Sequence, residues 1–309
     1  MFFFIYSLIS ITLILCYIAI ISIYIYYWNK LNVWNIPKGF SPQTTVSVII
    51  AARNEADVIK ECLNALIVQK YPNNLLQIWI VDDHSDDETS NIIKKFIKKN
   101  NADHFHYLKL SKGFKGKKDS IAAAIQQSYG ELIVTTDADC VMHPNWLLYL
   151  VSSYEKNNYK LIAAPVSFYE EKSLFERFQS LDFMGMMAVS AAGIKGRFMN
   201  MCNGANLAYE RQAFKSVNGF EGIDNISSGD DMLLMQKIDT KYPNKIGYIK
   251  NAESKTLTHA KSTITGFVQQ RIRWTSKSGA YSGWQVGAIL TTLFWRPNTF
   301  PRISSGVSA

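Results

Sequence analysis

Between residues 46 and 166 the sequence alternates short apolar runs with longer amphipathic segments, and no other feature constrains the fold as strongly. The apolar runs have the length and β-branched content of buried strands. The segments between them repeat apolar residues at helical spacing. This alternation predicts an α/β domain with a mixed, mostly parallel sheet and flanking helices. The predicted strands are 46–51, 76–81, 105–110, 131–136 and 161–166, and the predicted helices are 56–69, 86–99, 117–128 and 144–156.

Two of these helices carry sequence signals for their first turn. Ser85 and Glu88 have the spacing of a capping box, which predicts that a helix begins after Ser85. Pro144 fits the first turn of the helix at 144–156, where a missing N–H costs no hydrogen bond.

Polar side chains follow four of the predicted strands, at the point where each strand ends. In open α/β sheets, ligands bind outside the carboxyl ends of the strands. Each group alone has an ordinary explanation as a helix cap, an acidic turn or a solvated lysine. Their common position favours a binding site at this edge. The residues are Arg53 and Glu55, Asp82 and Asp83, Gly116 and Lys117, and Asp137 and Asp139.

The pair Asp137 and Asp139 directly follows a β-branched run. Alternate residues of a strand point the same way, so both carboxylates can face one point just past the strand end. Two such oxygen donors suit a Mg²⁺ or Mn²⁺ ion that also carries substrate phosphates. An isolated pair at this spacing is more often an acidic turn, and the polar groups at the neighbouring strand ends favour the metal.

Residues 2–28 contain no charged side chain. A helix needs about 20 apolar residues to span a bilayer, and this stretch is longer. It lacks the basic start and the small-residue cleavage site of a signal peptide, so residues 1–28 are predicted to form an uncleaved transmembrane helix. Residues 29–45 contain Pro37, Gly39 and Pro42 and are predicted to be a linker.

Basic residues follow the apolar stretch, beginning with Lys30 and Lys38, and only the chain terminus precedes it. The positive-inside rule then places the downstream domain in the cytoplasm, at the cell membrane. The whole chain has 33 Lys and Arg against 25 Asp and Glu, a net charge of +8. No basic block is dense enough for a nucleic-acid arm, so we expect a nucleotide substrate or anionic lipid as partner and no nucleic acid.

The four cysteines have no C-x-x-C spacing, so neither a zinc site nor a disulfide scaffold is indicated. After residue 170 the alternation of strands and helices breaks. Residues 172–201 are expected to form a helix that either closes the core or, as we favour, lies at the membrane surface. Asp230 and Asp231 precede another apolar helical run. The helix dipole alone could account for that acidic pair.

Near the end of the chain, Gln270, Arg273 and Trp274 share one face of a predicted helix. Arg273 can bind a phosphate through two hydrogen bonds, and Trp274 offers a stacking surface for a sugar ring. The alternative is a basic amphipathic helix at the membrane. Residues 284–295 are apolar but too few to span a bilayer. Residues 281–309 are therefore predicted to be the start of a second, truncated membrane segment.

These motifs, taken in order, resemble those of the membrane-bound glycosyltransferases of family 2, of the processive polysaccharide-synthase type. The resemblance runs from residue 46 to about residue 279 and implies a GT-A fold, with a nucleotide-sugar-binding half at 46–170 and an acceptor and catalytic half at 171–280. The signatures are Ala51-Ala52-Arg53-Asn54-Glu55, Asp82-Asp83-His84-Ser85-Asp86-Asp87, Asp137-Ala138-Asp139, Gly229-Asp230-Asp231 and Gln270-Arg271-Ile272-Arg273-Trp274.

The resemblance also implies a role for each matching residue. The family often has Glu where this chain has Asp230, which leaves the particular role of Asp230 open. The implied assignments are nucleotide or donor binding by Arg53, Glu55, Asp82, Asp83, Lys117 and Asp137, metal binding by Asp139, general base catalysis by Asp231, and diphosphate or acceptor binding by Asp230, Gln270, Arg273 and Trp274.

The implied function is inverting transfer of a sugar from a nucleotide-diphosphate sugar, with UDP expected, to a carbohydrate or lipid-linked acceptor in polysaccharide or glycolipid synthesis. Mg²⁺ or Mn²⁺ is the expected cofactor. One alternative is a membrane-tethered sugar nucleotidyltransferase, although residues 51–55 lack the Gly-rich phosphate loop that such enzymes usually have. Another is a phospho-acceptor receiver, which expects its acidic pair after the first strand. A third is a truncated, inactive transferase that only binds nucleotide.

Overall fold

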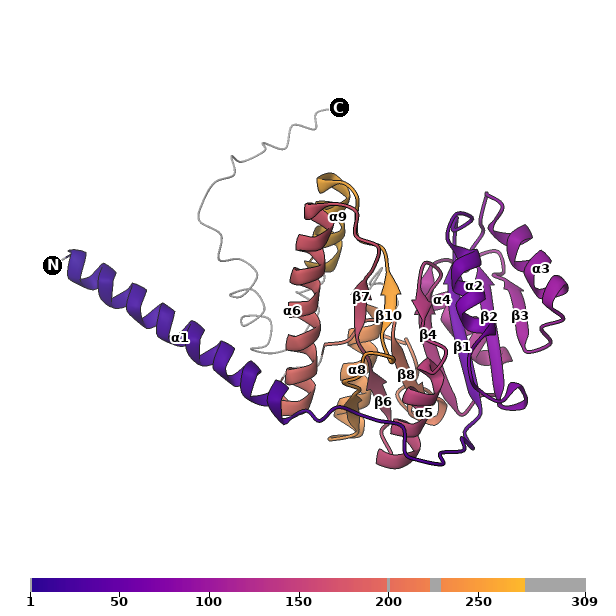
Figure 1. Ribbon diagram of the computed structural model, residues 1–309, viewed down its shortest axis with the longest axis horizontal. Helices are drawn as coiled ribbons and strands as arrows, with labels where there is room; N and C mark the ends of the chain where they lie inside the picture. The colour runs from indigo at the N-terminus through magenta and orange to yellow at the C-terminus, as the bar shows by residue number, and fades with distance from the viewer. Residues whose placement is uncertain (1, 199–200, 223–228, 276–309) are drawn as a thin grey trace.

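The computed structural model describes residues 2–198, 201–222 and 229–275 (Figure 1). Its described part contains one large sheet of seven strands, in which β8 runs antiparallel to both of its neighbours and every other neighbouring pair is parallel. The mixed, mostly parallel sheet predicted from the sequence is therefore confirmed. In spatial order the strands are β3 (Phe105–Lys109), β2 (Leu76–Asp82), β1 (Val46–Ala52), β4 (Leu132–Asp137), β8 (Leu207–Glu210), β6 (Leu161–Ala163) and β9 (Ile246–Tyr248).

Helices cover both faces of this sheet and thereby bury its central strands on both sides. On one face, α2 (Ile59–Ile67), α3 (Thr89–Asn100) and α5 (Trp146–Asn157) share a hydrophobic core cluster with Val48 and Ile50. On the other, α4 (Lys117–Gln127), α7 (Arg211–Ser216) and α8 (Asp230–Lys241) share a second core cluster with Ile49.

The register of the central strands brings their carboxyl ends level. Ala51 pairs with Asp137 across β1 and β4, and Ala52 pairs with Asp82 across β1 and β2. The strand order reverses between β1 and β4, which is where ligands bind in open α/β sheets. We call the edge where β1, β2, β3 and β4 end the carboxyl edge.

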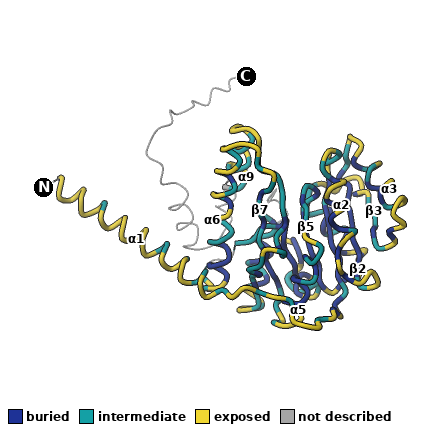
Figure 2. Tube along the Cα trace, in the orientation of Figure 1, coloured by how far each residue is buried: buried dark blue, intermediate teal, exposed yellow. Residues whose placement is uncertain are grey.

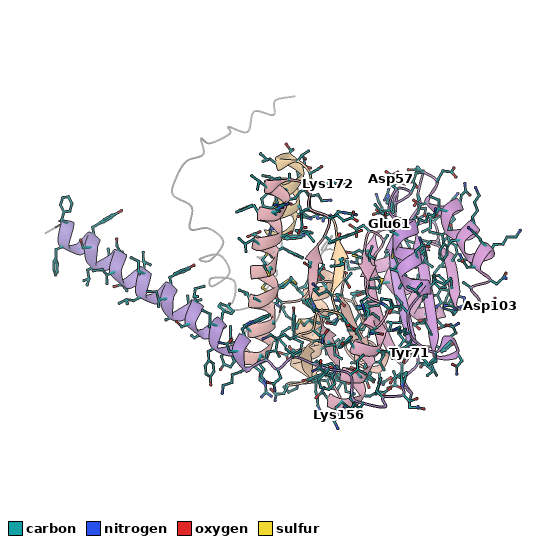
Figure 3. The ribbon with its side chains drawn as sticks, in the orientation of Figure 1. Asp57, Glu61, Tyr71, Asp103, Lys156 and Lys172 are labelled. Atoms are coloured by element: carbon teal, nitrogen blue, oxygen red, sulfur yellow. The ribbon has the colours of Figure 1, made fainter. Side chains whose placement is uncertain are left out.

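Helix α2 begins close to the carboxyl edge. Figure 3 shows Asp57 and Glu61 at the upper end of the sheet, with Tyr71 and Lys156 at the opposite end.

A second, smaller sheet of three strands lies beside the large one. It consists of β5 (Val141–Met142), β10 (Thr256–Thr258) and β7 (Val166–Phe168), with β10 in the middle. The single strand predicted at 161–166 is therefore wrong, because the chain leaves the large sheet after Ala163 and enters the small one at Val166. Pro165 lies at the break and has no N–H to continue a ladder.

Three helix starts also differ from the prediction, the first being α2, which begins at Ile59 and not at residue 56. Helix α3 begins at Thr89 and not at residue 86, with no side-chain hydrogen bond from its N-cap, Glu88. The predicted capping box is therefore wrong: Ser85 Oγ accepts a hydrogen bond from the Asn54 N–H instead (3.1 Å). Helix α5 begins at Trp146, two residues after Pro144.

Helix α1 (Phe2–Lys30) is the only described helix that is long and apolar enough to cross a membrane. At about 1.5 Å per residue, its 29 residues span about 43 Å, more than the hydrocarbon core of a bilayer. Its side chains are mostly exposed, and it projects away from the rest of the chain (Figure 2). The predicted second membrane segment at 281–309 lies outside the described residues.

The linker is predicted at 29–45, but α1 continues to Lys30, and residues 31–45 lie against the domain. Trp34 Nε1 donates to Ser152 Oγ (3.1 Å), and the Thr44 N–H and hydroxyl donate to Glu155 Oε1 (3.0 and 2.7 Å). Lys250 Nζ donates to the carbonyl oxygen of Trp28 (3.1 Å) and stands 4.1 Å from the centre of its ring. These contacts fix the end of α1 relative to the domain.

Helix α6 (Leu174–Gly196) has one face in the core and one face exposed. Phe183 is buried and stacks on Phe168, with 4.8 Å between ring centroids. Leu174, Phe178 and Leu181 are 82%, 51% and 65% exposed. The helix thus closes the core, and its exposed face keeps the apolar character expected of a membrane-surface helix.

Candidate active site

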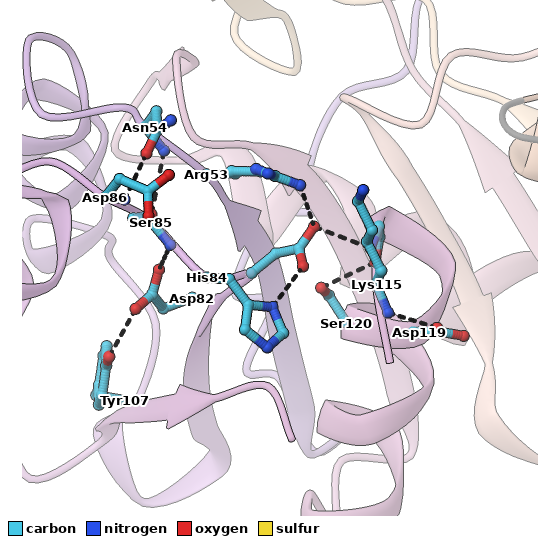
Figure 4. Close-up of polar contacts among 12 residues, drawn as sticks. Arg53, Asn54, Asp82, His84, Ser85, Asp86, Tyr107, Lys115, Asp119 and Ser120 are labelled. Atoms are coloured by element: carbon cyan, nitrogen blue, oxygen red, sulfur yellow. Dashed lines mark hydrogen bonds and ion pairs between the residues drawn. The ribbon is translucent and has the colours of Figure 1, made fainter. Parts of the chain in front are cut away.

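The first part of the site is a polar network where β1 and β2 end (Figure 4). Asp83 is buried and accepts a hydrogen bond from the Gly116 N–H (2.8 Å). Arg53 Nη1 lies 3.9 Å from the same carboxylate, and His84 Nδ1 lies 3.1 Å from its other oxygen. Arg53 and His84 remain 45% and 36% exposed at the side chain, so they line the open side of a site whose floor is Asp83.

Asp82 anchors the turn beneath this network. Its two oxygens accept hydrogen bonds from the Ser85 N–H (3.0 Å) and the Tyr107 hydroxyl (2.9 Å). Asn54 and His84 adopt left-handed backbone angles, with φ of 55° and 57°. The Asn54 amide oxygen accepts from the Asp86 N–H (2.8 Å), which ties the two turns together. Asp82 is only 1% exposed and both of its oxygens accept hydrogen bonds within this network, and its donor-binding role stays a prediction.

The second part of the site is formed by Asp137, Asp139 and Lys117. Asp137 is the last residue of β4, and Asp139 lies in the turn before β5. The Lys117 ammonium forms an ion pair with Asp137. Lys117 is the first residue of α4, and Gly116 before it has a φ of 89°, which favours glycine. The pKa of Lys117 is raised by Asp137, Asp230 and Asp231 against the opposing effect of burial, so it stays charged.

The third part is Asp231, in the first turn of α8. Its Oδ2 accepts a hydrogen bond from the Gly204 N–H (2.7 Å), and its Oδ1 accepts from the Met232 N–H (2.8 Å). Burial and the neighbouring Asp230 raise the pKa of Asp231 from 3.8 to about 6, although Lys117 and the two N–H groups oppose that shift. A carboxylate with this pKa can accept a proton near neutral pH.

Gly204 joins the second and third parts of the site. A Cβ atom at this position would lie 3.2 Å from Lys117 Nζ and 3.4 Å from Asp231 Oδ2. Its carbonyl oxygen accepts from the Thr135 hydroxyl of β4 (3.0 Å). The lysine that holds Asp137 therefore also lies beside Asp231.

The carboxyl group of Glu55 lies near enough to the aspartate pair for their charges to act on it, and its nucleotide-binding role stays a prediction. Burial, followed by the charges of Asp139 and Asp137, raises the pKa of Glu55 to about 7. Its backbone N–H donates to Thr89 Oγ1 (2.8 Å), which fixes the turn after β1.

The predicted face of Gln270, Arg273 and Trp274 lies on α9 (Ile264–Thr275). Arg273 is exposed, whereas Gln270 and Trp274 are partly buried. The Trp274 ring lies 5.8 Å from the Phe183 ring of α6, and the Arg271 guanidinium stands 4.6 Å from its centre. The described contacts of Trp274 thus join α9 to α6, and its role toward a sugar stays a prediction.

Two residues of the site, Gly204 and Thr258, are not among the predicted site residues. Gly204 lies in a turn held by Asn206, which is fully buried and accepts from Trp146 Nε1 (2.9 Å). Thr258 arrives from β10 and donates to Asp139 Oδ2 (3.1 Å). Strand β10 is only three residues long and shows no alternation, so only the polar turn around Gly204 could have been suspected.

The donor set at Asp137 and Asp139 fits a hard divalent cation. The carboxylate oxygens and the Cys140 sulfur lie within 4.8 Å of one another. The two carboxylates are partly exposed, and oxygen donors of this kind suit Mg²⁺ or Mn²⁺.

Comparison with known proteins defines the class to which this fold and site belong. A model of glycosyl transferase family 2 matches residues 47–217, more than half of the chain. The protein therefore belongs to glycosyltransferase family 2.

The chain matches individual relatives over part of their length. The chain is 30% identical to glycosyltransferase AglE of Haloferax volcanii over 60% of this chain and 59% of that protein. It is 28% identical to the probable glycosyltransferase YdaM of Bacillus subtilis, over 60% of this chain and 46% of that protein. It is 29% identical to the beta-monoglucosyldiacylglycerol synthase of Trichormus variabilis, over 57% of this chain and 37% of that protein. The chain thus matches less than two thirds of each of these relatives.

Solved structures share the fold. The mannosyltransferase PcManGT of Pyrobaculum calidifontis, in complex with GDP-Man and Mn²⁺, has a TM-score of 0.66 at 20% identity, over 93% of this chain and 81% of that chain. TarS of Staphylococcus aureus, in complex with UDP-GlcNAc, has a TM-score of 0.51 at 17% identity, over 71% of this chain and 59% of that chain. The predicted GT-A fold is confirmed by these likenesses.

Proposed function

We propose that the protein is an inverting glycosyltransferase that moves a sugar from a nucleotide-diphosphate sugar to an acceptor hydroxyl at the cytoplasmic face of a membrane. One observation carries the proposal: Lys117 pairs with Asp137 and also lies beside Asp231. A donor held at the aspartate pair would therefore have its reacting carbon near a carboxylate whose pKa is about 6.

Donor binding is assigned to the carboxyl edge. Arg53 and Asp83 would hold the nucleoside, with Asp82 supporting the turn beneath them. Asp137 and Lys117 would hold the diphosphate side of the donor, and Asp139 would hold the divalent cation. The two likenesses in complex with GDP-Man and UDP-GlcNAc support a nucleotide-sugar donor. We favour UDP, and GDP is the alternative.

Transfer would proceed in a single displacement. The acceptor oxygen forms a bond to the anomeric carbon, its proton passes to Asp231, and the bond from that carbon to the phosphate oxygen breaks. Lys117 stabilises the negative charge that develops on the departing nucleoside diphosphate. The cation, when bound, adds Lewis-acid stabilisation of the same charge. One displacement inverts the anomeric centre, so no second carboxylate is needed as nucleophile.

Membrane attachment is assigned to α1 and to the exposed apolar faces of α6 and α9. On α9, Ile264, Val268 and Ile272 are 68%, 46% and 60% exposed and recur at helical spacing. Tyr24 and Tyr27 of α1 contact Phe198, just past the end of α6, with ring centroids 5.3 and 5.5 Å apart. Exposed apolar side chains on α6, which contacts α1, and on α9 favour an acceptor presented at the membrane, in glycolipid or polysaccharide synthesis.

The nucleotidyltransferase alternative differs in the product it releases. The test is a screen of the purified full chain in detergent with Mg²⁺ or Mn²⁺, using UDP-sugars and GDP-sugars as donors. The proposal expects release of UDP or GDP that depends on the cation and increases when lipid extract is added as acceptor. Release of pyrophosphate from a nucleoside triphosphate and a sugar phosphate would contradict it, and nucleotide binding without turnover would favour an inactive transferase.

A further inference from the structure

Both carboxylate oxygens of Asp139 already have a hydrogen-bond donor. Thr258 Oγ1 lies 3.1 Å from Asp139 Oδ2, and Cys140 Sγ lies 3.5 Å from Asp139 Oδ1. A carboxylate has about two acceptor sites on each oxygen, so one bond to each leaves a lone pair on both oxygens for a cation. The two donors can therefore fix the orientation of the carboxylate without blocking it.

Thr258 reaches Asp139 from a distant and rigid part of the chain. The two residues are 119 positions apart in the sequence. Thr258 is the last residue of β10, the middle strand of the small sheet, with Leu257 paired to Val141 of β5 and Thr258 paired to Phe168 of β7. The Thr258 carbonyl oxygen also accepts from the Tyr169 N–H (3.2 Å). Its position is thus set by strands on both sides and not by Asp139 itself.

Cys140 lies in the same turn and also contacts Asp139. Its side chain is fully buried, and its sulfur points at an oxygen of Asp139. Cys62, also fully buried, has its sulfur 3.7 Å from the Asp137 carbonyl oxygen. A thiol is a weak donor, so Cys140 contributes less than the Thr258 hydroxyl.

We propose that Thr258 is a positioning residue for the metal-binding carboxylate of Asp139, and that Cys140 is a second, weaker one. The small sheet then has a role in catalysis, because it delivers a hydroxyl that holds Asp139 ready for the cation before the donor arrives. Hydrogen bonds to metal-binding carboxylates commonly set metal affinity in this way. The inference rests on the proposed metal role of Asp139.

The test measures Mn²⁺ affinity and not turnover. The full chain in detergent is titrated with Mn²⁺ in the presence of UDP, and separately GDP, and free Mn²⁺ is followed by electron paramagnetic resonance. Thr258→Val is expected to weaken Mn²⁺ binding by roughly 10- to 100-fold, which is typical when such a hydrogen bond is lost. Thr258→Ser keeps the hydroxyl and should restore most of the affinity. Cys140→Ala should weaken binding by a smaller factor.

The chain provides a matched control in the same strand. The Thr256 hydroxyl is buried and has no hydrogen-bond partner within the described part of the chain. Thr256→Val therefore makes the same chemical change two residues earlier and should leave Mn²⁺ affinity unchanged. Thermal unfolding of each variant shows whether it remains folded. If Thr258→Val does not fold, the Mn²⁺ affinity of Thr258→Ser is used for the test.

Three results would overturn the inference. The first is a Thr258→Val variant that binds Mn²⁺ within about twofold of the unmodified chain, while Asp139→Asn does not. The second is an effect of Thr258→Val that persists undiminished in an Asp139→Asn background. The third, which overturns the part assigned to Cys140, is a sulfur–metal absorption band with Cd²⁺ that disappears in Cys140→Ala, since Cys140 would then be a ligand. If the unmodified chain binds no Mn²⁺ with either nucleotide, the proposed metal role of Asp139 fails as well.

Discussion

Replacing Lys117 by methionine is expected to move the pH dependence of catalysis, because Lys117 lowers the pKa of Asp231. That pKa is about 6 with the lysine charge in place. As a general base Asp231 must be ionised, so kcat/KM should rise as the pH increases through 6 and reach a plateau above about pH 7. The methionine keeps the length of the side chain and removes only the charge.

The expected shift can be worked from the same interaction. An opposite charge close to a carboxyl commonly moves its pKa by one to three units, and we take about one unit because Lys117 is shared with Asp137. At pH 6.5 the ionised fraction of Asp231 would then fall from about three quarters to about one quarter. At pH 8.5 both proteins would be almost fully ionised. The ratio of kcat/KM at pH 8.5 to that at pH 6.5 should therefore rise about threefold.

The assay is kcat/KM for the donor, read as nucleoside diphosphate release between pH 5 and 9. Lys117 also holds Asp137, so the absolute rate will fall, and the midpoint of the profile is the quantity that tests the reasoning. Lys118→Met removes the same charge one residue away and should shift the midpoint less. A Lys117→Met profile that superimposes on the original after scaling would refute the role given to Lys117.

Three further predictions follow from single contacts. Asp231→Asn should raise the free energy of unfolding at pH 8 by at most about 3 kcal/mol. The raised pKa of Asp231 means that its ionisation destabilises the folded state above pH 6 and has no such effect below pH 4. Thermal melts of both proteins at pH 8 and at pH 4 test the sign. Gly204→Ala should lower kcat by about tenfold or more, because the added Cβ would lie 3.2 Å from Lys117 Nζ, whereas Gly185→Ala meets open space and should not. Lys250→Met removes the contacts with Trp28 and should speed hydrogen exchange across residues 31–45 by roughly tenfold, with Lys255→Met as control.

The strands of the carboxyl edge could be predicted because their amino-acid composition indicates both a β-strand and its burial. Strands β1, β2 and β4 are runs of β-branched residues that are buried on both faces, and polar residues begin where each run ends. The parallel arrangement then brings Asp83, Lys117 and Asp137 to one edge without any knowledge of the contacts. The strand pattern does not identify Asp231, which is assigned as general base only through the resemblance to the family.

The missed parts depend on contacts between distant segments. Strand β8 has four residues, and β9 and β10 have three each, too few to show a periodic pattern. The supposed cap at Ser85 fails because Asn54, 31 residues earlier in the chain, takes its hydroxyl as a hydrogen-bond acceptor. Residues 31–45 have the Pro and Gly content of a linker, yet Glu155 and Lys250 hold them on the domain. Such pairings are fixed by the tertiary fold and leave no local signal.

The most direct test of the account compares Asp231→Asn with Asp139→Asn in donor binding and in turnover. Binding is measured by calorimetry with the nucleotide-sugar identified in the donor screen, with and without Mn²⁺. We predict that Asp231→Asn binds the donor with the original, Mn²⁺-dependent affinity and loses turnover, whereas Asp139→Asn loses the Mn²⁺-dependent part of binding. An Asp231→Asn variant that transfers sugar at the original rate, or an Asp139→Asn variant that keeps Mn²⁺-dependent binding, would contradict it.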